Sequence, residues 1–148
     1  MINALSVANN ILHRSFSEDV DVNPMKLQRL IYLVYRNYLK KTGRSLFNER
    51  FETWKYGPVI LSVHEEFKYK GSNAIKLYSF KGDIVNETTS PDFKDVADTV
   101  WNTYKDYDGL VLSSLMQKEG SAWKKAYEKK SKFLLDEDIR DEEIMTYR

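Results

Sequence analysis

The chain has 148 residues, of which 42% are hydrophobic, 14% aromatic and 30% charged, and its formal net charge at pH 7 is +1. This apolar content excludes a disordered chain, the length fits one domain over residues 1–148, and the balanced charge provides no overall basic field for nucleic acid. The absence of cysteine excludes disulfides, thiolate nucleophiles and cysteine-ligated metal sites.

The N-terminal segment predicts two helices. Residues 4–13 place apolar side chains on one side of a short amphipathic helix, and residues 15–21 are predicted to form a loop. Asn23 and Pro24 then provide a helix cap and a first-turn proline, and Gly43 provides the end of a long helix. Apolar residues surround most of this helix, which is typical of a central helix; its main stripe contains Leu27, Leu30, Ile31, Val34 and Tyr38.

The middle of the chain predicts short strands and a third helix. Residues 51–54 alternate like a strand, and Tyr56-Gly57-Pro58 is predicted to turn the chain into a helix that Gly71 ends. Alternation over residues 75–80, a turn at 81–83 and Ile84-Val85 together predict a small hairpin.

The C-terminal part predicts only helices. Ser90 and Pro91 begin a helix with a clean apolar stripe that includes Trp101, and further helices are expected at 110–118, around Trp123 and from about Asp136. The fold class predicted is therefore mainly α with a small β-sheet or hairpin (α+β), arranged around a long central helix.

No pattern in the sequence predicts catalysis, a metal site or a cofactor. His13 and His64 lack a second histidine at ligand spacing, and the glycines are too scattered to cradle a phosphate. Glu65 and Glu66 are adjacent and point different ways on a helix, which favours a solvated face over an acid–base pair. No apolar stretch approaches the ~20 residues of a membrane span and residues 1–5 carry no basic leader, so a cytoplasmic protein is expected.

A basic stripe is the first candidate binding feature. Lys26, Arg29, Arg36 and Lys40 fall within a sector of about 80° on the second helix, with Tyr32 at its edge. The stripe fits either a solvated helix face or a docking surface for an acidic partner or phosphate groups. The acidic residues 136–143 follow a lysine-rich block at 124–132; such blocks are usually solubilising faces, and these can also attract each other or the stripe.

A rigid aromatic corner is the second candidate feature. Trp54 and Tyr56 flank Lys55 and are followed by Gly57 and Pro58. Such a corner is either core or an exposed anchor for a partner, and core is favoured for Trp54. Trp123 has the same two interpretations, whereas the stripe containing Trp101 is expected to be core.

Several segments together resemble the Panacea domain, a SocA-like, phage-associated antitoxin domain. They are residues 25–32, 38–39, 42–47 and 51–59, with a weaker match at 112–115 and 121–126. The resemblance implies a compact, mostly helical domain encoded beside a small toxin gene, which binds and suppresses that toxin. Toxins paired with this family include relatives of short alarmone synthetases, and the domain is not known for catalysis.

We therefore expect a non-enzymatic antitoxin that neutralises a cognate protein toxin by stoichiometric binding. The expected partner contacts are Lys26, Arg29, Tyr32, Arg36, Lys40, Lys55 and Tyr56, and the expected structural residues are Leu27, Leu30, Trp54, Gly57, Pro58, Trp101 and Trp123. The alternative is a phage or prophage regulatory protein: a host-protein inhibitor, a proteolytic adaptor or a DNA-binding repressor, the last marked by steep salt dependence. A small enzyme is a third class, which a deep pocket holding a histidine beside carboxylates would favour.

Overall fold

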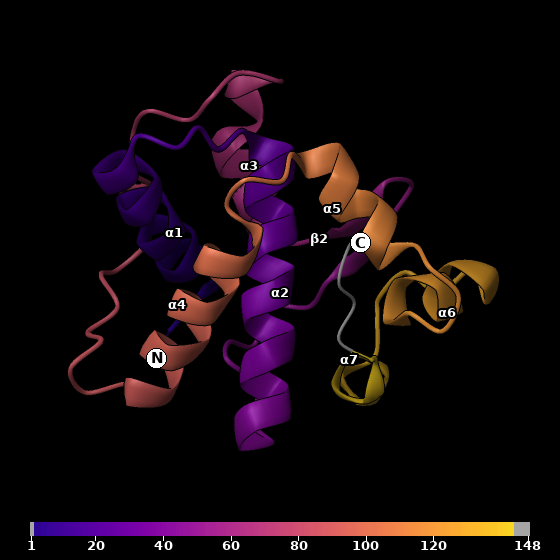
Figure 1. Cartoon of the computed structure of the whole chain (residues 1–148). Helices are drawn as coiled ribbons and strands as arrows, with labels where there is room; N and C mark the ends of the chain where they lie inside the picture. Colours follow the sequence, from indigo (N-terminus) through magenta and orange to yellow (C-terminus); the bar gives the residue numbers. More distant parts are fainter. Residues whose placement is uncertain (1, 144–148) are drawn as a thin grey trace.

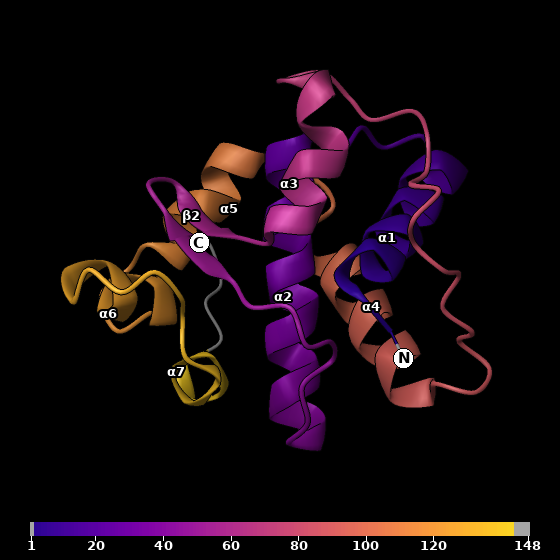
Figure 2. The same cartoon turned by 180° about the vertical axis from the view of Figure 1, so that it is seen from behind.

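The computed structural model describes residues 2–143, which fold into helices around one central helix and a small sheet (Figures 1 and 2). The predicted fold class is confirmed. The elements are α1 (Ala4–Glu18), α2 (Pro24–Thr42), β1 (Glu52–Trp54), β2 (Gly57–Val59), α3 (Leu61–Phe67), the 3₁₀ helix η1 (Lys68–Lys70), α4 (Pro91–Tyr104), α5 (Gly109–Met116), α6 (Ala122–Glu128) and α7 (Asp136–Asp141).

The central helix is α2, as its sequence predicts. Asn23 caps it by accepting a hydrogen bond from the backbone N–H of Lys26 at 2.9 Å, Pro24 occupies the first turn, and Gly43 ends it in the left-handed conformation with φ 73°. In Figures 1 and 2, α1 and α4 lie on one side of α2, and the sheet, α5, α6 and α7 lie on the other. Because α2 has neighbours on both sides, its side chains are buried around most of its circumference, Leu27 and Leu30 included.

Nine aromatic side chains are buried in the core. Tyr35 packs against Phe47 and Phe51 with ring centroids 4.8 and 5.1 Å apart. Trp101 and Trp123 are buried, whereas Trp54 is only half-buried at the edge of the sheet. None of the helices within residues 2–143 combines the length and apolar character that crossing a bilayer requires.

Two element boundaries differ from the sequence prediction. Helix α1 continues to Glu18, because Phe16 packs against the core and Asp19 ends the helix in the left-handed conformation. Residues 57–59 do not begin a helix: they form β2, which pairs antiparallel with β1 in the register Trp54↔Gly57 and Glu52↔Val59. The two strands therefore form a hairpin with Lys55 and Tyr56 at its turn, and α3 begins only at Leu61.

The hairpin predicted at residues 75–85 is wrong. Residues 71–90 contain no strand and run as an extended loop from η1 to α4 along α1. The amide of Asn9 in α1 accepts a hydrogen bond from the Ser79 backbone N–H at 2.8 Å and donates one to the Ser79 carbonyl at 2.9 Å. Backbone groups that a hairpin would pair with each other are therefore paired with α1.

Candidate functional site

The predicted basic stripe lies inside the protein. Lys26, Arg29, Tyr32 and Arg36 are all buried, and Arg36 has no exposed surface at all. Both interpretations of the stripe placed these side chains at the surface, and both are wrong for these four residues. The physical reason is that the chain after α4 runs back along this side of α2 and covers it with α5 and α7.

Arg36 is neutralised by the acidic C-terminal segment. Its guanidinium donates to Glu142 Oε2 at 2.9 Å, while Glu142 Oε1 accepts from the Tyr32 hydroxyl at 3.0 Å and from the Ala122 backbone N–H at 2.9 Å. Burial, followed by the charge of Glu142, raises the pKa of Tyr32 well above its ordinary value. The attraction between the acidic tail and the basic stripe, left open by the sequence, is confirmed at this position.

Arg29 holds the hairpin. Its guanidinium donates to the Pro58 carbonyl and, from Nε, to the Ser113 hydroxyl at 2.8 Å. No carboxylate within residues 2–143 pairs with it, and burial lowers its pKa to about 10. Arg29 therefore joins α2 to β2 and α5 through hydrogen bonds rather than through an ion pair.

Three further side chains fix the backbone of the hairpin. Gln28 bonds both backbone groups of Ile60, at 3.0 Å to its carbonyl and 2.9 Å from its N–H. Trp123 of α6 donates to the Trp54 carbonyl at 2.7 Å, and Gln117 donates to the Tyr56 carbonyl at 3.0 Å. The hairpin is thus anchored to α2, to α6 and to the residue that ends α5. These hydrogen bonds hold the backbone on both sides of its turn in one position.

The turn and α6 carry exposed aromatic and basic side chains. Tyr56 at the turn is 54% exposed, and Tyr127, stacked on Trp123 with ring centroids 4.6 Å apart, is 49% exposed. Several exposed lysines here form no ion pair within residues 2–143, unlike Lys41, Lys94 and Lys105 on other elements. We call this set the hairpin–α6 surface: Lys55, Tyr56, Tyr127, Lys129, Lys130 and Lys132.

Of the predicted contact residues, the structure brings Lys55 and Tyr56 to this surface. Lys40 lies elsewhere, beside α7, where its ammonium donates to the Arg140 carbonyl at 2.6 Å. Sequence reasoning missed Tyr127 and treated the neighbouring lysines as a solubilising block. The signal for Tyr127 was its spacing of four residues from Trp123, which places both rings on one face of a short helix.

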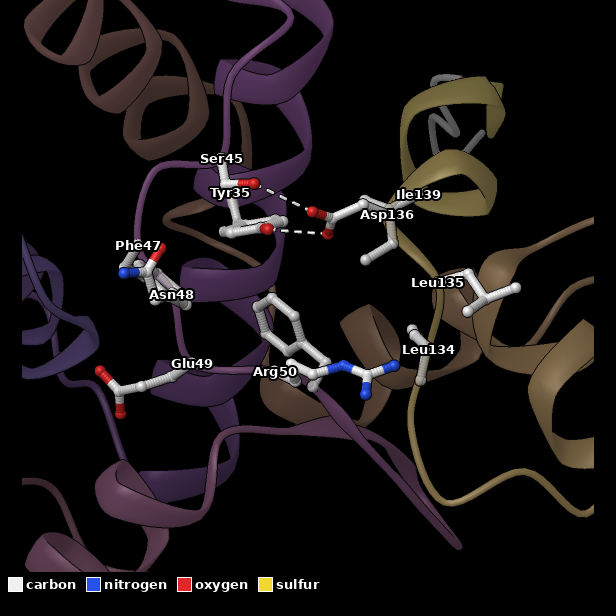
Figure 3. A pocket seen from close by; sticks show the side chains of 11 residues that line it. Tyr35, Ser45, Phe47, Asn48, Glu49, Arg50, Leu134, Leu135, Asp136 and Ile139 are labelled. Carbon is white, nitrogen blue, oxygen red and sulfur yellow. Dashed lines mark hydrogen bonds between the residues drawn. The ribbon is translucent and has the colours of Figure 1, made fainter.

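A small cavity of about 300 Å³ lies between α2, residues 45–51 and α7 (Figure 3). Three of its polar side chains bond one another: Asp136 accepts from the Tyr35 hydroxyl at 2.7 Å and from the Ser45 hydroxyl at 2.9 Å. No histidine is among its lining residues, and no group of three or more metal-ligating side chains converges anywhere within residues 2–143. This cavity therefore gives no support to the small-enzyme class. A second, larger groove between α1 and residues 78–87 does hold a histidine near a carboxylate, His13 and Glu87, but the carboxylate of Glu87 is paired with Arg14 at 2.7 Å.

Comparisons with known proteins agree with the sequence resemblance. The family described as antitoxin SocA-like, Panacea domain, matches residues 27–124. The protein named Antitoxin SocA from Caulobacter vibrioides (strain NA1000 / CB15N) is 34% identical over 85 residues, which cover 57% of this chain and 45% of that protein. The match thus spans less than half of that relative's length, and no solved structure matches. The family match includes the residues that anchor the hairpin and ends before the acidic tail.

Proposed function

The chain belongs to the SocA-like antitoxin family with a Panacea domain, and on this premise we propose that it neutralises a cognate protein toxin by direct, stoichiometric binding. The family supports an antitoxin with a toxin partner and a regulatory role. We further propose that the toxin is encoded by the adjacent gene. Toxins related to short alarmone synthetases are the first class to test.

The observation that supports this mode of action is the rigid presentation of the hairpin–α6 surface. Hydrogen bonds from Arg29, Gln117 and Trp123 fix the hairpin backbone before any partner arrives. A surface fixed in advance loses little conformational entropy on binding, which favours high affinity. An affinity near 1 nM corresponds to about −12 kcal/mol, and a few aromatic and basic anchors commonly dominate such an interface.

The charge of this surface indicates an acidic partner. Lys55, Lys129 and Lys130 are exposed and have no carboxylate partner within residues 2–143, so a complementary acidic face would both steer and orient the toxin. We propose Lys55, Tyr56 and Tyr127 as direct contacts and Lys40 as a further contact beside α7. Lys26, Arg29, Tyr32 and Arg36 then act by holding the fold that presents this surface.

Coexpression with the adjacent open reading frame tests the proposal. The neighbour alone should arrest bacterial growth, and this chain should restore growth and co-purify with it. The double variant Lys55→Glu, Tyr56→Ser should weaken binding by about a hundredfold, as expected for two anchor residues, without changing the melting temperature. Lys81→Glu, an exposed lysine on the loop beside α1, is the matched control and should bind normally.

A harmless neighbour, or rescue without association, would contradict direct neutralisation. Unchanged affinity in the double variant would contradict the choice of surface while leaving the antitoxin role intact. Binding to duplex DNA with a steep salt dependence would instead indicate the repressor alternative.

A further inference from the structure

The loop of residues 71–90 exposes large apolar side chains on the α1 side of the molecule. Phe80 is 98% exposed and Ile84 is 91% exposed, and Leu77 is also largely exposed. Single exposed apolar residues are ordinary, but an exposed cluster on one loop marks an interaction surface. We call this set the Phe80 loop: Leu77, Tyr78, Phe80 and Ile84.

Phe80 is held in this exposed position by fixed points on both sides. Before it, Ser79 bonds Asn9 through its backbone and Glu66 through its hydroxyl at 2.6 Å. After it, Gly82 lies so close to α1 that an added Cβ would come within 2.6 Å of the Leu5 carbonyl. The ring therefore projects from an anchored backbone, and burying it against a partner requires little ordering of the chain.

A groove of about 760 Å³ lies on the same face, between α1 and the loop. Its lining includes His13 and Asn10 from α1 and Tyr78, Phe80 and Ile84 from the loop, and most of its exposed lining is apolar. The face thus carries a groove that has the exposed Phe80 ring in its wall and is large enough to receive a second ring beside it. That combination is what a twofold interface requires, because each copy must supply both halves of the contact.

We propose that the Phe80 loop binds a second copy of this chain, with Phe80 of each copy packed into the groove of the other. Charge favours this occupant over an acidic or basic partner. Glu87, the one carboxylate among the lining residues, is already paired with Arg14 at 2.7 Å. The exposed charges of the loop between Phe80 and Ile84, Lys81 and Asp83, are opposite in sign and offset each other. A twofold interface places like against like, so a face with little net charge can meet itself, whereas the lysines of the hairpin–α6 surface would repel their own copies.

The size of the apolar face is sufficient for the centre of such an interface. Aromatic side chains bury about 150–250 Å² each, so two Phe80 rings contribute roughly 300–500 Å² of the ~1,200–2,000 Å² typical of stable interfaces. Leu77 and Ile84 of both copies extend this centre. The Phe80 loop and the hairpin lie on opposite sides of α2 in Figures 1 and 2, so a dimer leaves the hairpin–α6 surface free.

Analytical ultracentrifugation of the isolated chain over a concentration series tests the proposal. The unaltered chain should form a concentration-dependent dimer, and Phe80→Ser and Ile84→Lys should each weaken dimerisation about tenfold or more. Leu110→Ser, which removes an exposed leucine from α5, is the matched control and should leave the dimer unchanged. Thermal unfolding of each variant establishes that the monomers are folded.

A chain that is monomeric throughout the series would overturn the proposal, as would a Phe80→Ser variant that dimerises normally. Loss of toxin co-purification by Phe80→Ser in a monomeric antitoxin would also overturn it, by assigning the loop to the toxin. None of these results depends on the proposed toxin contacts at the hairpin, so the two proposals fail separately.

Discussion

The guanidinium of Arg29 lies directly against the backbone of Gly57: a Cβ placed on Gly57 would come within 2.8 Å of Arg29 Cζ. Gly57 has φ 139°, a conformation that side-chain-bearing residues rarely adopt. Two separate reasons therefore require glycine at position 57: its backbone angle disfavours any side chain, and the Arg29 guanidinium occupies the space that a Cβ would need. Two of the segments that carry the family resemblance, residues 25–32 and 51–59, meet at this contact.

Gly57→Ala should lower the free energy of unfolding by about 2–4 kcal/mol, because backbone strain adds to displacement of a buried guanidinium. Chemical denaturation measures the loss. Gly120→Ala is the control, since Gly120 also has a positive φ, 85°, but open space around its Cβ position. It should cost only about 1 kcal/mol, the cost of backbone strain alone. Equal losses in the two variants would show that Arg29 does not constrain Gly57.

Glu142→Ala should destabilise the fold by about 3–5 kcal/mol, because it leaves the charge of Arg36 buried and unpaired. Replacing both partners, Arg36→Met with Glu142→Leu, should recover part of that loss, since no charge then remains to be desolvated. Urea denaturation of the single and double variants gives the coupling energy. Glu137→Ala, which removes an exposed acidic residue of the preceding helix α7, should be nearly neutral. Additive losses in the double variant would contradict the coupling.

Stability should fall at alkaline pH through Tyr32. Burial and the charge of Glu142 raise the pKa of this hydroxyl in the folded protein, whereas the unfolded chain ionises it near the ordinary pKa of about 10. Above that pH the folded state binds more protons than the unfolded state, so the free energy of unfolding decreases as pH rises. The stability that depends on the protonated Tyr32 hydroxyl is fully present below about pH 10 and is lost as the pH rises from there toward the raised pKa of the folded state.

Tyr32→Phe removes this titration, although it costs about 1–3 kcal/mol at neutral pH through the lost hydrogen bond to Glu142. Between neutral pH and about pH 11, the variant should therefore lose less stability than the unaltered chain. Urea denaturation over a pH series measures both profiles. Parallel profiles would exclude a raised pKa at Tyr32.

Asn9→Ala should release the Phe80 loop without unfolding the helices. The substitution removes the side chain that bonds the Ser79 and Gly82 backbones, and leaves two buried groups of Ser79 unpaired. We expect a loss of about 1–3 kcal/mol and faster amide hydrogen exchange confined to residues 77–85. Asn102→Ala, an exposed asparagine of α4, should leave exchange in the loop unchanged. Exchange that rises across α1 and α2 as well would show that the loop is part of the core.

Sequence reasoning succeeded where a structure is determined by neighbouring residues. The caps at Asn23 and Gly43 and the stripe containing Trp101 lie within the elements that they define, so α2 and α4 could be predicted. The prediction failed where residues far away in the sequence determine the local structure. The alternation near Ser79 is real, but Asn9, 70 positions earlier, takes the hydrogen bonds of that backbone.

At the candidate site, too, features determined by neighbouring residues could be predicted and features determined by distant residues could not. A helical wheel placed Arg29 and Arg36 on one side of α2 correctly, but it contains no information about what covers that side. Ser113 and Glu142, which bury the two guanidinium groups, lie 84 and 106 positions further along the chain. The exposure of Lys55 and Tyr56 could be inferred from sequence because the turn that carries them is encoded by their own neighbours, Trp54 and Gly57; their role as partner contacts stays a prediction.

The ion pair between Arg36 and Glu142 also sets an order for biosynthesis, because the two residues are 106 positions apart. At about 5–20 residues per second, the ribosome makes the carboxylate roughly 5–20 s after the arginine that it neutralises. During that interval α2 carries an uncompensated cation on a face destined for the interior, which opposes closure of α5 and α7 over it. The hydrogen bond from Trp123 to the Trp54 carbonyl, which helps to hold the hairpin, can likewise form only after Trp123 has been synthesised. Chains whose translation stops before residue 142 therefore lack the Arg36–Glu142 pair, so the fold that carries the proposed hairpin–α6 surface is completed only after residue 142 has been made.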